Sequence, residues 1–225
     1  MRKNNLSTLQ RRQALLSLAG ASALALTAVP SRAQNAERRT TPAQSLGPFY
    51  PRSPSERPQQ TDNDLVTVDG DRVLTKGTPL YLTGRVVTRN GQGVAHAQVE
   101  IWQCDANAVY HHPAGGAEAE RDQAFQGYGR TRTDGEGAFH FRTIRPVPYP
   151  GRTPHIHVRI ESAGLVTLGT QLYLANDPGN ARDFLFQRLT EAERLAVTLT
   201  LRPTAATHPL ARGTLYSADV ELVVA

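Results

Sequence analysis

The chain has a single cysteine, Cys104, so no disulfide can form within it. One thiolate also excludes the cysteine-rich sites that structural zinc domains use. An exported chain of this kind must be held together by its hydrophobic core, by contacts between subunits or by a metal ion. We expect Cys104 to pack as a small apolar side chain without chemistry of its own.

Long hydrophobic runs are also scarce; one apolar run, Ala14–Val29, lies near the N-terminus. It follows the basic stretch Met1–Arg12 and precedes Ser31-Arg32-Ala33, a small-x-small cleavage signal, which is the layout of a secretory leader. The arginine pair in the basic stretch resembles a twin-arginine export signal. We therefore expect residues 1–33 to be a cleavable export signal and the protein to be periplasmic or extracellular. Because the run is shorter than the roughly 20 residues of a spanning helix, we expect no stable membrane insertion after cleavage; an uncleaved anchor is the alternative.

An excess of positive charge is missing outside this leader. The chain has 25 Lys and Arg against 20 Asp and Glu, but five of the basic residues and none of the acidic ones lie within residues 1–33. Residues 34–225 therefore carry 20 of each sign, and their charge gives no support to nucleic-acid binding. Their length suits one domain with a sizeable core.

Residues 34–78 are rich in Pro, Gln, Arg and Asp and show little hydrophobic periodicity. We expect them to form an extended N-terminal arm that wraps either the domain or a neighbouring subunit, with Ser45–Pro51 as its ordered part. Wrapping a neighbour would make the protein a homo-oligomer.

From Pro79 onward, short alternating runs separated by turn signals predict a single all-β domain, a β-sandwich over 79–225 with short helical and loop insertions. Asn90-Gly91-Gln92-Gly93 and Asp134-Gly135-Glu136-Gly137 each lie between two runs and predict two β-hairpins. A helical piece is expected near Pro178–Leu189, where the alternation breaks. The expected strands are Leu80–Val87, Ala97–Gln103, Gly127–Thr133, Ala138–Ile144, His155–Glu161, Gly169–Ala175, Leu195–Leu201 and Leu215–Val224.

Two of the seven histidines, His155 and His157, lie in one expected strand. Because strand side chains alternate between faces, both imidazoles stand on the face opposite to the apolar residues of that strand. Such an i, i+2 pair is suited to chelating a metal ion. The alternative is a pair that is merely exposed or hydrogen-bonded on the sheet. Carboxylates nearby are sparse, and Glu161 is the nearest.

Tyr149 lies close to this pair in a proline-rich loop, and its phenolate would be a hard, anionic oxygen donor. A phenol has a pKa of about 10, so a trivalent ion deprotonates it far more easily than zinc does. Two tyrosinates and two imidazoles would therefore hold non-haem Fe(III). The residues alone leave the second tyrosine open among Tyr50, Tyr81, Tyr110, Tyr128, Tyr173 and Tyr216.

Several stretches, taken in order along the chain, resemble the intradiol ring-cleavage dioxygenase family, which includes protocatechuate 3,4-dioxygenases and catechol 1,2-dioxygenases. They are Gly47–Pro51, Val99–Tyr110, Phe125–Pro150, Arg152–Val158 and Gly169–Leu174. The resemblance makes Tyr110, which follows Trp102 at the family's Trp-x7-Tyr spacing, the second phenolate. The implied iron ligands are then Tyr110, Tyr149, His155 and His157.

The same resemblance implies roles for three residues in the reaction. Tyr149 would leave the iron when substrate binds and accept a substrate proton, Arg152 would stabilise negative charge that develops on the ring, and Gln171 would orient the substrate. The expected reactants are a small aromatic diol of the catechol type and O2, and the expected product is a cis,cis-muconate. The loop from Tyr149 to Arg152 is shorter than is usual in the family, and the sequence shows no long N-terminal helical segment of the catechol 1,2 type.

Two other classes stay open from the sequence. A non-catalytic β-sandwich binding module would keep the fold without the chemistry, and a zinc or copper hydrolase would use the histidine pair. We expect Trp102 to lie in the core and the five other histidines not to bind metal. These five are His96, His111, His112, His140 and His208.

Overall fold

The computed structural model describes four stretches of the chain, residues 37–68, 75–163, 168–204 and 215–225. The predicted export signal, residues 1–33, and His208 lie outside the described residues. Within the four described stretches, no helix is long and apolar enough to cross a membrane.

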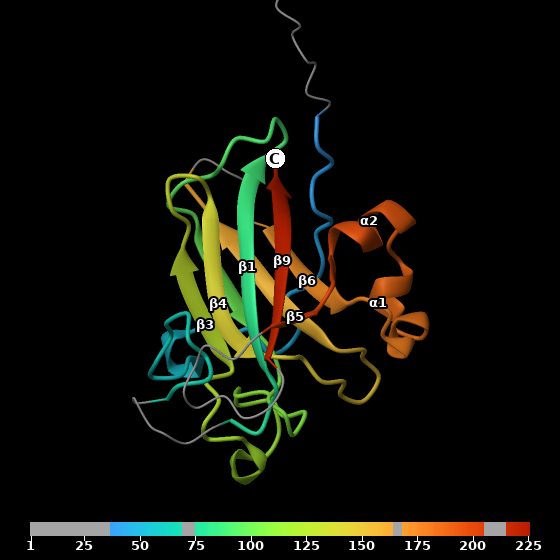
Figure 1. Ribbon diagram of the computed structural model, residues 1–225. Helices are drawn as coiled ribbons and strands as arrows, with labels where there is room; N and C mark the ends of the chain where they lie inside the picture. The colour runs from blue at the N-terminus through green and yellow to red at the C-terminus, as the bar shows by residue number, and fades with distance from the viewer. Residues whose placement is uncertain (1–36, 69–74, 164–167, 205–214) are drawn as a thin grey trace, which may run out of the picture. The chain divides into compact units, whose positions relative to one another are not determined.

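The prediction of an all-β sandwich is confirmed, because the strands form two sheets accompanied by a few short helices (Figure 1). One sheet has the strand order β4-β1-β9-β8, and the other has the order β3-β2-β5-β6-β7. The strands are β1 Pro79–Thr88, β2 Gln98–Trp102, β3 Tyr128–Arg132, β4 Ala138–Ile144, β5 His155–Glu161, β6 Leu168–Leu174, β7 Thr198–Leu199, β8 Arg202–Thr204 and β9 Leu215–Val224. The helical elements are η1 Pro54–Glu56, η2 Glu118–Glu120, η3 Pro178–Ala181, α1 Phe184–Gln187 and α2 Glu191–Ala196.

Strand β5 has a central place in the five-stranded sheet. It is antiparallel to β2 on one side and to β6 on the other. The register sets His157 opposite Trp102 of β2 and opposite Gln171 of β6. Residues directly opposite each other in antiparallel strands point to the same face. The side chains of Trp102 and Gln171 therefore lie on the same face of the sheet as that of His157.

The two predicted hairpins are wrong, although both turns form. The Thr88 amide donates to the Gln92 carbonyl, and the Gly137 amide donates to the Asp134 carbonyl. However, β1 and β2 enter different sheets, and so do β3 and β4. In a sandwich both sheets bury their inner faces in one core, so a tight turn that crosses between sheets satisfies the same apolar pattern as a hairpin.

The strand predicted at Leu195–Leu201 is wrong in its first half. Helix α2 covers Glu191–Ala196, and β7 begins only at Thr198. The helix starts with a capping box, in which the Thr190 hydroxyl accepts from the Glu193 amide and the Glu193 carboxylate accepts from the Thr190 amide. These two bonds satisfy amides that have no partner inside a helix and outweigh the alternation. The helical piece expected near Pro178–Leu189 is present as η3 and α1.

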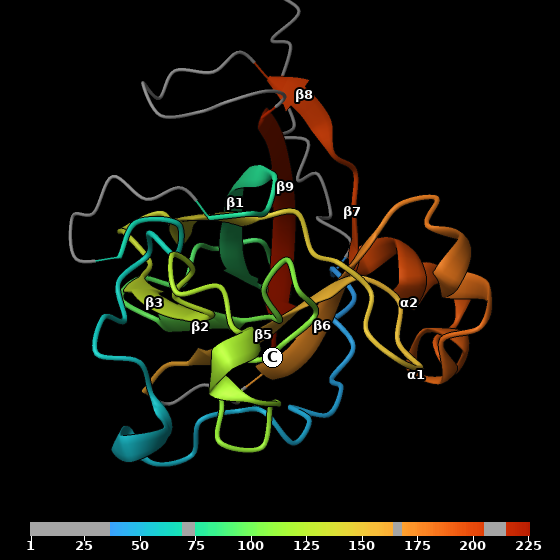
Figure 2. The same cartoon turned by 90° about the horizontal axis from the view of Figure 1, so that it is seen from below.

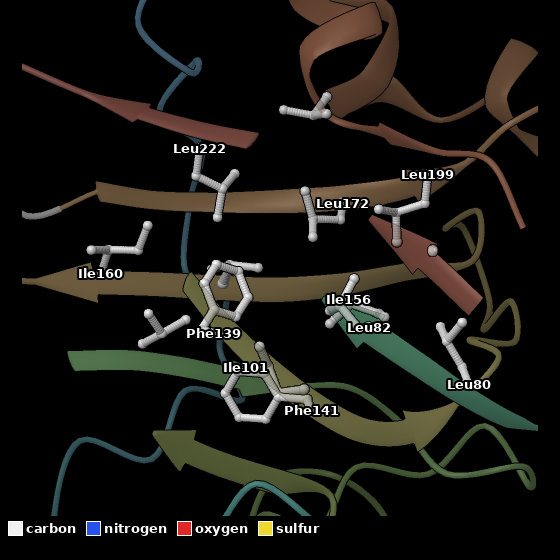
Figure 3. Close-up of a cluster of buried hydrophobic side chains, with 14 of the residues drawn as sticks. Leu80, Leu82, Ile101, Phe139, Phe141, Ile156, Ile160, Leu172, Leu199 and Leu222 are labelled. Carbon is white, nitrogen blue, oxygen red and sulfur yellow. The ribbon is translucent and has the colours of Figure 1, made fainter. Parts of the chain in front are cut away.

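The main hydrophobic core lies between the two sheets (Figure 3). Strands β1, β2, β4, β5, β6, β7 and β9 contribute residues to it, and full burial of a large apolar side chain stabilises by about 1.5–3 kcal/mol. Because the apolar residues of β5 point into this core, its histidines point to the opposite, outer face of the sheet. The labelled core residues are Leu80, Leu82, Ile101, Phe139, Phe141, Ile156, Ile160, Leu172, Leu199 and Leu222.

The middle part of residues 37–68 covers the outer face of the five-stranded sheet, on the side away from the core (Figure 2). Toward its two ends, Thr41 bonds to Val223 of β9 and Leu65 enters the main core. This segment crosses β6, β5, β2 and β3 in turn, so an outer sheet face that water would otherwise reach becomes a second buried layer. The contacts, strand by strand, are Gln44 with Gly169 of β6, Gly47 with His157 of β5, Tyr50 with Trp102 of β2 and Thr61 with Arg130 of β3.

Candidate metal centre

The histidine pair of β5 is buried beneath residues 37–68. His155 and His157 are each only 2% exposed, and their Nε2 atoms lie 3.2 Å apart. The Trp102 ring stacks on the His157 ring at 4.8 Å between centroids and 6° between planes. A Cβ on Gly47 would lie 3.4 Å from His157 Cε1. The two imidazoles, whose planes are nearly perpendicular, are therefore held in a buried layer rather than exposed on the sheet.

The backbone carbonyl of Thr153 sets the tautomer of His155. It lies 2.7 Å from His155 Nδ1, which must donate because a carbonyl can only accept. Nε2 of His155 then carries the lone pair and faces the cluster, which is the arrangement of a metal-binding histidine. Nδ1 of His157 has no hydrogen-bond partner among the described residues, so stacking on Trp102 holds that ring.

Tyr110 reaches the histidines from the segment that follows β2. Its hydroxyl oxygen lies 3.4 Å from His155 Nε2, and its side chain is buried. Phe49 of the N-terminal arm stacks on the Tyr110 ring at 4.3 Å between centroids. The arm thus helps to fix the direction in which this phenol points.

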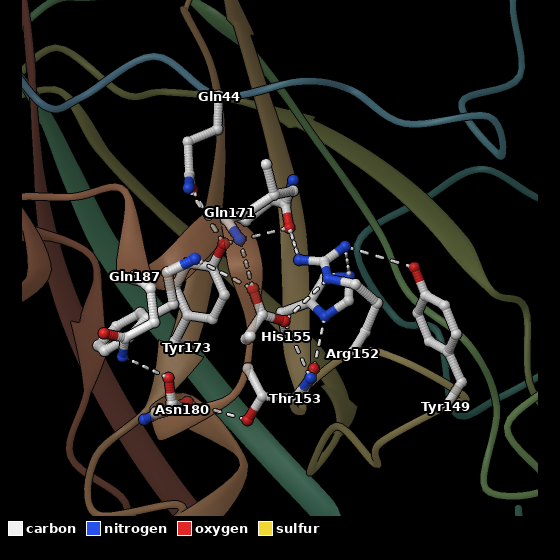
Figure 4. Close-up of polar contacts among 12 residues, drawn as sticks. Gln44, Tyr149, Arg152, Thr153, His155, Gln171, Tyr173, Asn180 and Gln187 are labelled. Carbon is white, nitrogen blue, oxygen red and sulfur yellow. Dashed lines mark hydrogen bonds and ion pairs between the residues drawn. The ribbon is translucent and has the colours of Figure 1, made fainter.

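Tyr149 and Arg152 come from a tight turn directly before β5. The Arg152 amide donates to the Tyr149 carbonyl, Pro150 is the second residue of the turn, and Gly151 has a φ of +82°. Proline followed by a glycine of positive φ is the pattern of a type II turn. The turn places Arg152 Nη1 3.4 Å from Tyr149 Oη and 3.5 Å from His155 Nε2 (Figure 4).

The Arg152 guanidinium is anchored on its other edges. Nη2 donates to Gln171 Oε1 at 2.6 Å, and Nε donates to Asp183 Oδ2 at 2.8 Å. The Gln171 amide group donates in turn to the Ser45 carbonyl of the arm. The structure therefore places the six residues singled out from the sequence together, Tyr110, Tyr149, Arg152, His155, His157 and Gln171.

Burial decides the protonation states of the four candidate ligands. Burial, and then the positive charge of Arg152, lowers the pKa of His155 to about 4, and burial lowers the pKa of His157 well below its usual value. Both imidazoles are thus neutral near pH 7, the form that binds metals. Burial also raises the pKa of Tyr110 and of Tyr149, although Arg152 opposes this at Tyr149. Both phenols therefore stay protonated near pH 7 unless a bound cation displaces the protons.

These donors fit a ferric ion. Two atoms bound to one ion at about 2.1 Å lie about 3–3.5 Å apart, and the Tyr110–His155 and His155–His157 separations of 3.4 and 3.2 Å fall in that range. In the described part of the chain, His, Cys, Asp and Glu form no group of three or more that could hold a metal. Two neutral imidazoles and two phenols are therefore the candidate donors of this site, and phenolates favour a hard, highly charged ion.

The sequence did not predict that three residues contact the site, namely Phe49, Thr153 and Asp183. Phe49 lies within a stretch that resembles the family, but nothing in the residue type pointed to stacking on Tyr110. Asp183 precedes Phe-Leu-Phe, which is a helix-start signal, yet its contact with Arg152 bridges residues far apart in the sequence. The Thr153 carbonyl is a backbone group with no sequence signal.

The other described histidines lie elsewhere. His111 Nε2 lies 3.2 Å from the buried carboxylate of Asp105, and His112 Nδ1 accepts from the Ala114 amide. His96 and His140 are exposed. Trp102 is buried, as expected for a core residue, and in addition packs on His157.

Comparison with known proteins places this geometry in a family. A protein-family model described as "Dioxygenase" (Dioxygenase_C) matches residues 47–216. The protocatechuate 3,4-dioxygenase beta chain of Burkholderia cepacia is 35% identical over 176 residues, which cover 71% of this chain and 73% of that protein. The catechol 1,2-dioxygenase of Candida albicans is 30% identical over 165 residues, and the match spans only 49% of its length.

A solved structure gives the same result. The dioxygenase domain of a dioxygenase carbohydrate-binding protein fusion from Streptomyces sp. SirexAA-E is 31% identical, with a TM-score of 0.58 over 82% of this chain and 97% of that domain. The chain therefore belongs to the dioxygenase family. Within it, the relatives identify the chain as an intradiol ring-cleavage dioxygenase, which confirms the family suggested by the sequence motifs.

Proposed function

We propose that the protein is a non-haem Fe(III) enzyme that cleaves a catechol-type aromatic diol between its two hydroxylated carbons. The observation that carries the proposal is the convergence of Tyr110 Oη, His155 Nε2 and His157 Nε2, with neighbouring separations of 3.4 and 3.2 Å, beside the Tyr149–Arg152 turn. Diol plus O2 has the composition of a cis,cis-muconate, so the reaction needs no external reductant.

Tyr110, Tyr149, His155 and His157 are the residues that would hold the iron. When bound, Fe(III) would supply a Lewis acid that binds the diol as its dianion and makes the ring electron-rich toward O2. Tyr110 is buried and packed against Phe49, which suits a ligand that stays in place. Tyr149 is only half-buried and lies in a turn, which suits a ligand that moves away and takes a substrate proton at Oη.

Arg152 and Gln171 would act on the substrate itself. Nη1 of Arg152 points to the Tyr149 and His155 donor atoms, so its charge lies beside the place where the diol would bind. A fixed cation in a largely dry layer stabilises negative charge on the ring without reorganising. Gln171, which bonds to Arg152 and to the arm, would orient the substrate and the guanidinium together.

The substrate belongs to the class of aromatic rings with adjacent hydroxyl groups. Relatives are named for protocatechuate, catechol and hydroxyquinol, all of which have this feature. The four donors and Arg152 recognise the two oxygens and the ring charge, which these compounds share, so we propose activity on this class.

The test combines metal analysis, colour and oxygen uptake. Iron-loaded protein should contain about one iron per chain, show the visible charge-transfer band of tyrosinate bound to Fe(III), and consume O2 with catechols to give the ultraviolet spectrum of a muconate. Tyr110→Phe should bind iron much more weakly and lose colour in proportion. Tyr128→Phe is the matched control, because Tyr128 is a buried tyrosine of the same aromatic cluster that lies outside the candidate donor set.

Arg152→Ala should separate metal binding from turnover. Its iron content and colour should match the wild-type protein, and kcat should fall by about 100- to 1,000-fold, the usual cost of removing one preorganised charge-stabilising donor. A colourless, iron-free wild-type protein would favour a non-catalytic sandwich module, and zinc in place of iron would favour a hydrolase.

We also propose that residues 1–33 direct export and are removed, so the enzyme acts outside the cytoplasm. The support is the basic, apolar and small-residue order of this segment. Mass spectrometry of the protein from a periplasmic fraction should show a chain that starts at Gln34. Full-length protein confined to the cytoplasm would contradict this proposal.

A further inference from the structure

Asp183 is a buried carboxylate with more than one task. It is 1% exposed and lies directly before helix α1. Its Oδ1 accepts from the amides of Leu185 and Phe186, which caps the helix. Its Oδ2 accepts from Arg152 Nε at 2.8 Å and from the Thr153 amide at 3.0 Å. One side chain thus links the helix start to the turn that carries the proposed catalytic arginine.

The contacts of Asp183 decide which edge of the Arg152 guanidinium faces the ligands. With Nε bound to Asp183 and Nη2 bound to Gln171, only Nη1 is left to point to Tyr149 Oη and His155 Nε2 (Figure 4). A guanidinium is planar and rigid, so two anchored nitrogens fix the position of the third.

The surroundings make Asp183 the charged partner of Arg152. The two side chains are 0% and 9% exposed, and a buried guanidinium without a counter-charge is strongly unfavourable. Burial by itself would raise the pKa of Asp183, but the Phe186 and Thr153 amides and the Arg152 guanidinium together lower it, so the group is ionised. The Phe184 ring, with its centroid 5.6 Å from the Arg152 guanidinium carbon, closes the outer side.

We infer that Asp183 is a positioning residue for ring cleavage, which holds Arg152 in the orientation that places Nη1 beside the metal ligands. The inference rests on the proposed function, in which Arg152 stabilises charge on the ring. Asp183 does not touch the ligand atoms in this arrangement, and its direct bond to the charge-stabilising group is the one to Arg152. Its bond to the Thr153 amide is a second link to the turn, and unchanged iron content and colour would show that this link does not carry the effect.

The variants Asp183→Ser and Asp183→Asn test this. Serine and asparagine cap helices about as well as aspartate, so α1 keeps its start. Serine cannot reach the guanidinium, and asparagine has a single acceptor oxygen for what are now four donors. Asp177→Asn is the control, because Asp177 caps the neighbouring helix η3 and does not contact Arg152.

The first measurement is steady-state turnover of the iron-loaded enzymes. Both Asp183 variants should keep iron content and colour and lose about 10- to 100-fold in kcat, the usual cost of removing such an outer partner, with KM changed much less. In the Arg152→Ala background, Asp183→Ser should cause no further loss. Equal kcat in Asp183→Ser and Asp177→Asn, or a further loss in the double variant, would overturn the inference.

The second measurement does not depend on turnover. A dicarbonyl reagent that modifies arginine, followed by mass spectrometry, should label Arg152 several-fold faster in Asp183→Ser than in the wild-type protein or in Asp177→Asn. Unchanged labelling of Arg152 would overturn the positioning role even in an active enzyme. If the wild-type protein cleaves no catechol but Arg152 is still labelled faster in Asp183→Ser, the proposed function would be overturned while the Asp183–Arg152 link stays in place.

Discussion

The protonation states of the four candidate ligands predict how many protons the protein gives up when iron binds. Burial raises the pKa of Tyr110 and Tyr149 above 10.0, so both phenols are protonated at pH 7. The pKa of His155 is lowered to about 4 and that of His157 is lower than usual, so both imidazoles are already neutral at pH 7 and release no proton when a metal binds. Iron binding should therefore release two protons from the protein, one from each tyrosine.

The magnitude follows from the reference pKa of the phenol. Deprotonating one phenol of pKa about 10 at pH 7 costs about 4 kcal/mol, and each unit of pH removes about 1.4 kcal/mol of that cost. Iron affinity should thus rise about tenfold per pH unit for each tyrosine ligand, or about 100-fold for two. Tyr110→Phe should lower the change in iron affinity to about tenfold per pH unit. His157→Ala should weaken iron binding but leave its pH dependence unchanged.

The assay is competition for iron against a ferric chelator between pH 6.5 and 8, combined with calorimetry in buffers of different ionisation enthalpy to count released protons. Protons taken up by the chelator are common to all the proteins and cancel in the differences. A water that replaces Tyr110 on the ion can itself release a proton, so the tyrosinate charge-transfer band is recorded together with the proton count. Tyr128→Phe, a buried tyrosine outside the donor set, should behave as the wild-type protein does. A Tyr110→Phe protein that releases as many protons as the wild type and keeps the same charge-transfer band would refute the assignment of Tyr110 as a ligand.

Two further predictions concern stability. The pKa of His155 in the folded protein, about 4, lies below its usual 6.5, so the unfolded chain takes up a proton first as the pH falls. The iron-free protein should therefore lose about 2–3 kcal/mol of unfolding free energy between pH 7 and 4.5 from this group. In urea denaturation, His155→Gln should lose that much less over the same range. Gly47→Ala and Gly151→Ala should each cost about 1 kcal/mol, because both glycines have positive φ. Both variants should also weaken iron binding, Gly47→Ala because the strained arm packs on His157 and Gly151→Ala because the strained turn carries Tyr149. Unchanged iron binding in Gly47→Ala would contradict contact between arm and site.

Local pattern predicted the strands well but not their partners. The bounds expected for β4, β5 and β9 agree with the structure, because alternation of apolar and polar residues reports directly on burial. The hairpin predictions failed because a tight turn looks the same whether the next strand pairs with the last one or crosses to the facing sheet. The start of α2 was missed because its two capping bonds outweigh a short alternating run.

The site shows the same division between near and distant contacts. The turn from Tyr149 to Arg152 and the pair on β5 are local, so their proximity could be inferred from spacing. Tyr110 could not be chosen among the tyrosines by residue type, because its approach to His155 depends on the register of β2 against β5. Asp183 depends on a helix that packs back on the turn.

The N-terminal arm explains why an outer sheet face can host this chemistry. An antiparallel sheet commonly leaves one face in water, where exposed histidines would titrate near pH 6.5 and phenols would gain little from a fixed cation. Coverage by residues 37–68 removes that water, lowers the imidazole pKa values and fixes Gln171 through the Ser45 carbonyl. The sandwich core supplies the rigid strand, and the arm supplies the dry environment, so a change in the arm that leaves the core intact should alter iron binding before it alters the fold.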